Sequence, residues 1–86
     1  MPAEETFRCL KIARRCAAIG GTACAVMNGA NEVAVGAFLD GRVGFCDIPA
    51  LVEIALGEVE QVSNPALADI LEADRLAREA VTAHLK

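Results

Sequence analysis

Apolar side chains recur every three or four positions along most of this chain, which is the spacing of one face of an α-helix. In the first such segment the apolar residues alternate with basic ones, so the apolar side predicts a buried helix face. The apolar positions are Phe7, Leu10, Ala13 and Ala17. Thr6 is the expected N-cap of this helix, and the glycine pair Gly20-Gly21 is expected to end it.

A second helix is expected from about Ala23 to Leu39, with Gly41 as its C-terminal signal. This segment is apolar around nearly its whole circumference, which is typical of a helix with neighbours on several sides. One polar patch interrupts it at the i, i+3, i+4 spacing of a single helix face. The patch consists of Asn28, Asn31 and Glu32.

Two later segments begin with a capping residue followed by a proline, which is a helix-start pattern. The first predicts a helix from Asp47 to about Gly57 or Val59. The second, at Asn64-Pro65, predicts a helix that continues to about Leu85. The expected inner face of this last helix is apolar except for one carboxylate, and it consists of Leu67, Ile70, Leu71, Asp74, Ala77, Val81 and Leu85.

Four helices with short connections in 86 residues predict one all-α domain, residues 1–86, folded as a compact four-helix bundle. The composition agrees, since 17 residues are alanine, the best helix former, and 55% are hydrophobic, which excludes intrinsic disorder. A net charge of −4 and only three aromatic residues argue against nucleic-acid binding.

The longest uncharged stretch, residues 16–31, is too short and too rich in glycine and asparagine to span a membrane. The chain opens on acidic residues rather than on the basic and apolar run of a secretory signal. We therefore expect a cytoplasmic protein whose four cysteines are reduced.

The chain contains no glycine-rich phosphate loop, no Cys-x-x-Cys pair and only one histidine, His84. We therefore expect no catalytic, cofactor-binding or metal-binding residues.

Polar side chains on otherwise apolar helix faces must be paired, because an unsatisfied buried polar group costs about 1–3 kcal/mol. Four residues meet this description: Asn28, Asn31, Glu32 and Asp74. We expect at least two of the four to be mostly buried and hydrogen-bonded. The candidate donors to Asp74 are backbone N–H groups at the start of a neighbouring helix or an arginine such as Arg78. This cluster is expected to set helix register, and the alternatives are a ligand-binding or catalytic role and a contact with a partner domain.

Four segments of the chain form a recognisable set: Phe7-Arg8-Cys9-Leu10-Lys11-Ile12-Ala13, Met27 to Leu39, Arg42 to Pro49, and Asp74-Arg75-Leu76-Ala77-Arg78. Together they resemble the C-terminal region of the 1-deoxy-D-xylulose 5-phosphate reductoisomerase family. The resemblance runs from about Phe7 onward, and it departs from the family at Arg8, where the family usually has a proline.

The resemblance implies a parent oxidoreductase of the methylerythritol phosphate pathway of isoprenoid biosynthesis. The family's enzyme is an NADPH-dependent reductoisomerase that uses Mg or Mn, works as a homodimer, and carries a nucleotide-binding domain, a catalytic domain and a helical bundle. This chain resembles only the bundle, and the family's metal-binding and substrate-binding motifs are not found in it.

On this resemblance the chain itself is expected to be a catalytically inert structural domain. Its partners are the catalytic and nucleotide-binding domains of the same enzyme, and docking against them implies an exposed apolar patch. A free-standing helical protein-interaction module is the alternative.

Overall fold

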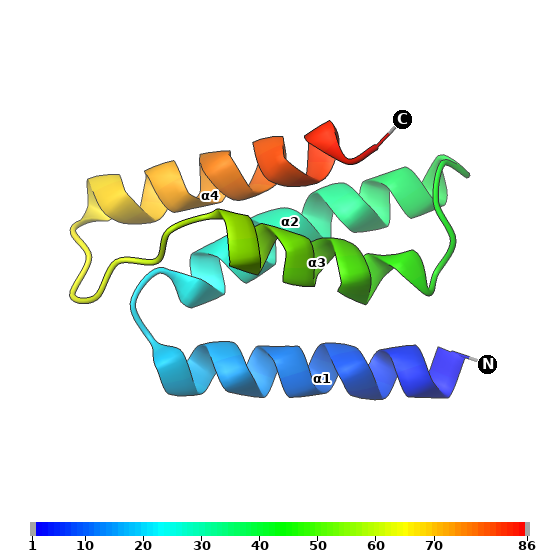
Figure 1. Ribbon diagram of the computed structural model, residues 1–86, viewed down its shortest axis with the longest axis horizontal. Helices are drawn as coiled ribbons and strands as arrows, with labels where there is room; N and C mark the ends of the chain where they lie inside the picture. Colours follow the sequence, from blue (N-terminus) through cyan, green and yellow to red (C-terminus); the bar gives the residue numbers. More distant parts are fainter. Residues whose placement is uncertain (1, 86) are drawn as a thin grey trace.

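The computed structural model describes the backbone of residues 2–85 and the side chains of residues 6–85. This part of the chain forms four α-helices and no β-strand (Figure 1), which confirms the predicted all-α four-helix architecture. The helices are α1 (Pro2–Ile19), α2 (Ala23–Leu39), α3 (Asp47–Glu58) and α4 (Leu67–Ala83). Among the helices described, none is long and apolar enough to cross a membrane.

The boundaries of α2 and α3 follow the predicted signals. Gly20 and Gly21, which separate α1 from α2, both have positive φ angles, and so does Gly41, two residues after the end of α2. These are conformations that glycine adopts without a steric penalty. At the start of α3, the side chain of Asp47 accepts a hydrogen bond of 2.8 Å from the backbone N–H of Gly44.

Two predicted helix starts are wrong. Helix α1 begins at Pro2, so Thr6 lies within it and is not its N-cap. Proline is well suited to a first helical turn, since it has no N–H to leave unpaired there. Helix α4 begins at Leu67 rather than directly after Pro65, because Asn64 adopts a left-handed conformation (φ 52°) that turns the chain before the helix. It ends at Ala83, two residues earlier than predicted.

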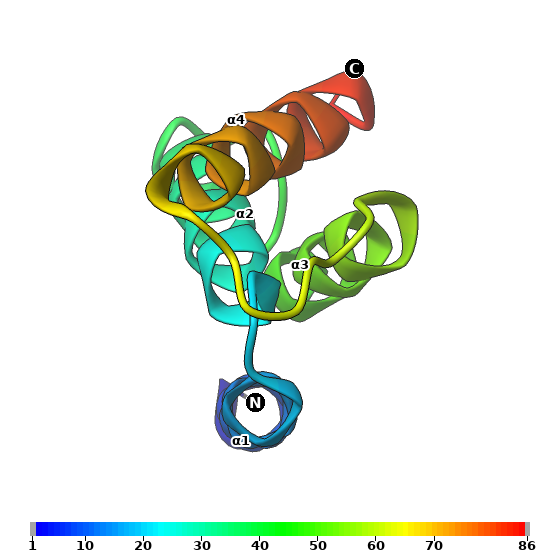
Figure 2. The ribbon, with the colours of Figure 1, turned by 90° about the vertical axis from the view of Figure 1, so that its left-hand side faces the viewer.

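Helix α2 lies at the centre of the molecule and contacts all three other helices. Helices α3 and α4 also contact each other, so α2, α3 and α4 form a three-helix unit. Helix α1 packs on α2 and α3 but makes no contact with α4 within the described part of the chain. In Figure 2, which looks along the helices, α1 lies apart from the group formed by the other three.

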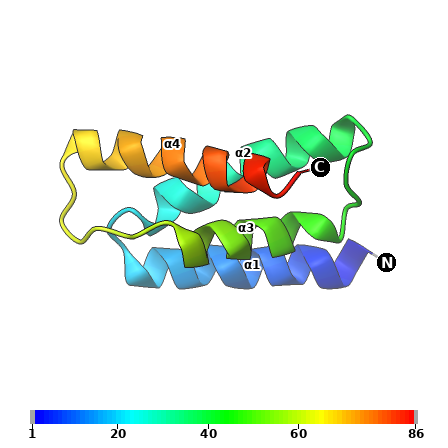
Figure 3. The same cartoon turned by 45° about the horizontal axis from the view of Figure 1, so that its top comes forward.

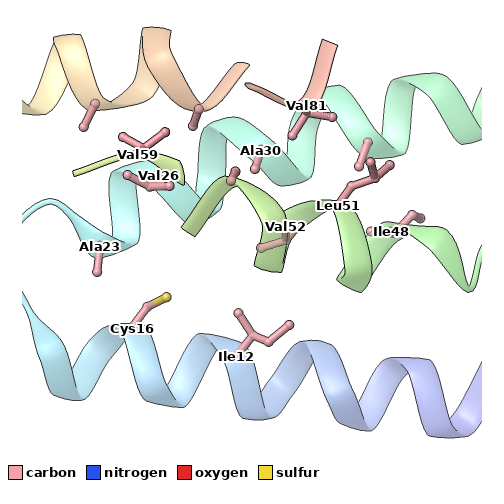
Figure 4. Packing of buried hydrophobic residues seen from close by; sticks show 14 residues of the cluster. Ile12, Cys16, Ala23, Val26, Ala30, Ile48, Leu51, Val52, Val59 and Val81 are labelled. Carbon is pink, nitrogen blue, oxygen red and sulfur yellow. The ribbon is translucent and has the colours of Figure 1, made fainter. Parts of the chain in front are cut away.

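The core is built mainly from alanine and valine (Figure 4). Its buried residues are Ile12, Cys16, Ala23, Val26, Ala30, Ala34, Ile48, Leu51, Val52, Ala55, Val59, Ala73, Ala77 and Val81. Small side chains let helix axes approach closely, and α2 and α4 lie close together at Gly29. A Cβ atom at Gly29 would lie 2.6 Å from Oδ1 and 3.0 Å from the backbone oxygen of Asp74.

The predicted inner face of α1 is wrong. Phe7, Leu10 and Ala17 are exposed and Ala13 is half-buried, whereas Ile12 and Cys16 are the buried residues. In Figure 4 both side chains point from α1 towards the other helices. Helix α1 carries two apolar stripes, and the one that packs inward is the one with the smaller or branched side chains.

The predicted inner face of α4 is correct only in part. Ala77 and Val81 are buried, but the face turns towards Ala73 rather than towards the large residues at the start of the helix. Leu67, Ile70 and Leu71 are exposed, and Leu85 is half-buried. Alanine at this contact allows α4 to lie close against α2, and the bulkier leucines are left on the outside.

Candidate functional site

The four residues of the predicted polar cluster come from α2 and α4, and the structure brings two of them together through one arginine. Arg78 donates from Nη2 to Oε1 of Glu32 at 2.7 Å and from Nε to Oδ2 of Asp74 at 3.0 Å. The hydrogen bond to Asp74, followed by the hydrogen bond to Glu32, raises the pKa of Arg78. The predicted pairing of Asp74 with Arg78 is therefore confirmed.

The predicted burial of this cluster is wrong. Asn28, Asn31 and Glu32 are exposed, and Asp74 is half-buried. Neither asparagine side chain has a hydrogen-bond partner among the described residues. The physical reason is that α2 buries its alanine and valine side against α3 and α4, whereas the side that carries the asparagines faces solvent. An apolar helix in a small domain therefore keeps one uncovered face.

A buried threonine, which the sequence analysis missed, holds the two connections at one end of the molecule together. Thr22 is the one fully buried polar residue among those described. Its Oγ1 accepts a hydrogen bond of 2.8 Å from the N–H of Val62, and its own N–H donates to the backbone oxygen of Val62 at 3.0 Å. The sequence signal was a hydroxyl residue between a glycine pair and an apolar helix.

Several open grooves lie between neighbouring helices, and two of them contain candidate functional residues. The first, between α1 and α3, has a volume of about 520 Å³ and is lined by Phe7, Arg8, Lys11, Ile12, Arg15 and Glu53. The second, between α2 and α4, has a volume of about 410 Å³ and is lined by Gly21, Cys24, Ala25, Asn28, Ile70, Leu71 and Asp74. The first groove is basic and the second is mixed apolar and polar.

The remaining candidates for chemistry are scattered. The four cysteines carry thiols rather than disulfides. Burial, followed by the charge of nearby Cys24, raises the pKa of the Cys16 thiol, which keeps it protonated and weakly nucleophilic. His84 is exposed and lies 2.9 Å from Oε2 of Glu58. Within residues 6–85, no group of three or more histidine, cysteine or acidic side chains could hold a metal ion.

Comparison with known proteins identifies the family. The model of the DXP reductoisomerase C-terminal domain matches residues 1–80. The chain belongs to this family. This confirms the resemblance found in the sequence. No solved structure matches the chain.

Three similar curated relatives are much longer than this chain. The 1-deoxy-D-xylulose 5-phosphate reductoisomerase of Stutzerimonas stutzeri (strain A1501) is 45% identical over 78 residues, which are 91% of this chain and 20% of that protein. The reductoisomerase of Ectopseudomonas mendocina (strain ymp) is 47% identical over 77 residues, which are 90% of this chain and 20% of that protein. The reductoisomerase of Acidithiobacillus ferrooxidans (strain ATCC 53993 / BNL-5-31) is 44% identical over 84 residues, which are 98% of this chain and 22% of that protein. The chain thus spans about a fifth of the length of these relatives.

Proposed function

We propose that this chain is the C-terminal structural domain of a reductoisomerase that converts deoxyxylulose phosphate to methylerythritol phosphate. It acts by packing against the catalytic and nucleotide-binding domains, and it takes no part in the reaction. The observation that carries this proposal is the family match over residues 1–80 together with the coverage of only a fifth of each relative. On the same proposal the whole enzyme is a cytoplasmic homodimer.

The described residues, 6–85, do not fit NADPH or a divalent metal. A dinucleotide loop joins a strand to a helix, but Gly20 and Gly21 join two helices. The acidic pair at Glu72 and Asp74 is already engaged, because Arg75 binds Glu72 and Arg78 binds Asp74. We therefore assign the cofactor and the metal ion to the other domains of the enzyme.

Exposed apolar side chains support a packing role. The large apolar residues at the surface are Phe7, Leu10, Ile19, Phe38, Leu39, Phe45, Val62, Leu67, Ile70 and Leu71. An apolar patch is expected on a domain that docks against others, and these exposed side chains support that expectation. In a small domain that acts alone, this much apolar surface would favour aggregation.

The first test is a titration of the 86-residue chain by calorimetry with NADPH and Mn²⁺, separately and together. We expect no binding at millimolar ligand concentrations. Micromolar binding of either ligand would refute the assignment of the cofactor and metal ion to the other domains.

The second test replaces the matched fifth of the Stutzerimonas stutzeri enzyme with this chain. We expect the chimera to oxidise NADPH with deoxyxylulose phosphate at a rate within about tenfold of the parent. A chimera that carries Val26→Asp is the control, because a charge at this fully buried position prevents the bundle from packing. If the unmodified chimera is as inactive as this control, the proposed function is wrong.

A further inference from the structure

We infer that the other domains of the reductoisomerase dock on one particular end of the bundle. This inference rests on the proposed function. We call this surface the aromatic end, and it consists of Phe7, Phe38, Leu39 and Phe45. The occupant is a surface of the preceding domain that presents an apolar patch rimmed by carboxylates.

All three aromatic residues of the chain lie at this end. Phe38 and Leu39 complete α2, Phe45 lies in the connection to α3, and Phe7 lies near the start of α1. Figures 1 and 3 both place the start of α1 and the α2–α3 connection at the same end of the molecule. Phe7 is 61% exposed and Leu39 is 76% exposed.

Leaving aromatic side chains at the surface is costly for so small a domain. Each buried aromatic side chain removes about 150–250 Å² from water, more than the alanines and valines that form this core. Aromatic residues are enriched among the residues that dominate protein interfaces.

Two of the aromatic residues are already held in place for binding. The rings of Phe38 and Phe45 meet edge to face, with centroids 5.6 Å apart and an angle of 68° between their planes. A rigid pair of this kind loses little conformational entropy on binding.

The opposite end of the bundle is also apolar, but the path of the chain favours the aromatic end. The aliphatic residues exposed there are Ile19, Val62, Leu67, Ile70 and Leu71. In the relatives, the matched region is a C-terminal domain, so the rest of the polypeptide enters at the start of α1. Because α1 is about 27 Å long, a short tether brings the preceding domain to the aromatic end at a much higher effective concentration than to the other end.

Charge identifies the chemistry of the occupant. The groove between α1 and α3 opens beside Phe7, and Arg8, Lys11 and Arg15 line it. Glu53 is the acidic residue of this groove, and it pairs with Arg8. A basic strip on a chain of net charge −4 is complementary to carboxylates, which would lie around the apolar patch of the partner domain.

Amide hydrogen exchange of the chimera and of the 86-residue chain tests the location directly. We expect residues 40–46, at the aromatic end, to exchange at least tenfold more slowly in the chimera. Residues 60–66, at the opposite end, should exchange at the same rate in both proteins. Protection of residues 60–66 instead, or no protection of either segment, would overturn the inference.

Activity separates the two proposals. An active chimera without protection at residues 40–46 refutes the docking end alone, whereas an inactive chimera refutes the proposed function as well. Two matched variants give an independent check, since Leu39 and Leu67 are 76% and 71% exposed and lie at opposite ends.

In the chimera, Leu39→Ser should reduce the protection of residues 40–46 at least tenfold, and Leu67→Ser should leave it within twofold. Neither variant should change the melting temperature of the 86-residue chain. Equal effects of the two variants on protection, or a larger effect of Leu67→Ser, would overturn the inference.

Discussion

Helix α1 and the three-helix unit of α2, α3 and α4 are held in different ways. Each helix of the unit contributes three or more buried residues, and each contacts both of the others. Helix α1 is the longest of the four, yet among its described side chains only Ile12 and Cys16 are buried. Its other large apolar residues, such as Phe7 and Leu10, are exposed.

The difference shows that the length of a helix does not determine how strongly it is packed against the rest of the bundle. The three-helix unit is stabilised by close contact between small side chains. Among its described residues, α1 buries only Ile12 and Cys16, and the ion pair between Arg8 and Glu53 also links it to α3. Partly exposed ion pairs of this kind contribute about 0–1 kcal/mol. We therefore expect α1 to open at a lower free energy than the rest of the bundle.

The largest expected effect comes from truncating one buried aliphatic residue in each region. Leu51→Ala in α3 should lower the free energy of unfolding by about 2–5 kcal/mol, because it leaves a cavity in the buried core cluster. Ile12→Ala should cost less, since α1 can detach and leave the three-helix unit folded. Urea unfolding followed by circular dichroism measures both values, and an equal or larger cost for Ile12→Ala would contradict the comparison.

Substitutions at two glycines of α2 test how closely α2 and α4 must approach each other. Gly29→Ala should destabilise the protein by about 1–3 kcal/mol, because the new Cβ would overlap Asp74 of α4. Gly36→Ala is the matched control in the same helix, where nothing lies within 4 Å of the added atom. This control should be neutral or stabilise by about 0.5–1 kcal/mol. Thermal melts of both variants measure the difference. Equal melting temperatures would show that α2 and α4 are not in close contact at Gly29.

The smallest expected effect concerns pH and the surface of α4. The hydrogen bond from Arg75 lowers the pKa of Glu72. A lowered pKa means that the ionised carboxylate stabilises the fold. This contribution is fully present above about pH 5 and is lost as the pH falls below the ordinary range of a carboxyl group, near 4.3.

Glu72→Gln should therefore lower the melting temperature by about 1–3 °C at pH 7 and should match the unmodified chain at pH 2.5. Glu60→Gln is the control, because Glu60 is exposed and forms no ion pair with a described residue. A difference for Glu72→Gln that persists at pH 2.5 would show that the pair with Arg75 is not its cause.

The helix boundaries could be predicted from the sequence where a glycine or an aspartate fixed the backbone locally, as at Gly41 and Asp47. Asp47 marks the start of α3 correctly, but it is the first residue of the helix, and the predicted N-cap position is occupied by Cys46. The buried faces could be predicted less well. Periodicity identifies apolar stripes but does not say which of two stripes will pack inward. In α1 the stripe with Phe7 and Leu10 has more apolar surface, yet the stripe with Ile12 and Cys16 fits against the neighbouring helices.

For the polar cluster, the sequence could suggest one ion pair, but it did not predict that the four side chains are not buried. An arginine one helical turn after Asp74 lies within reach of the carboxylate, so the sequence could suggest this pair. The structure shows the pair of Asp74 with Arg78. Burial of Asn28 and Asn31 depends on how many neighbours cover α2, which is a property of the whole bundle. For the same reason, the hydroxyl residue between the glycine pair and the apolar helix marks Thr22 as unusual but does not identify Val62, forty residues away, as its partner.

Amide hydrogen exchange of α1 in the 86-residue chain tests the central claim most directly. The claim is that α2, α3 and α4 form the stable scaffold, and that α1 is attached to this scaffold more weakly than its three helices are to one another. We predict that interior amides of α1 exchange at least tenfold faster than those of α2, which corresponds to an opening free energy lower by about 1.4 kcal/mol. Equal protection of α1 and α2 would contradict the claim and would show that all four helices unfold as one unit.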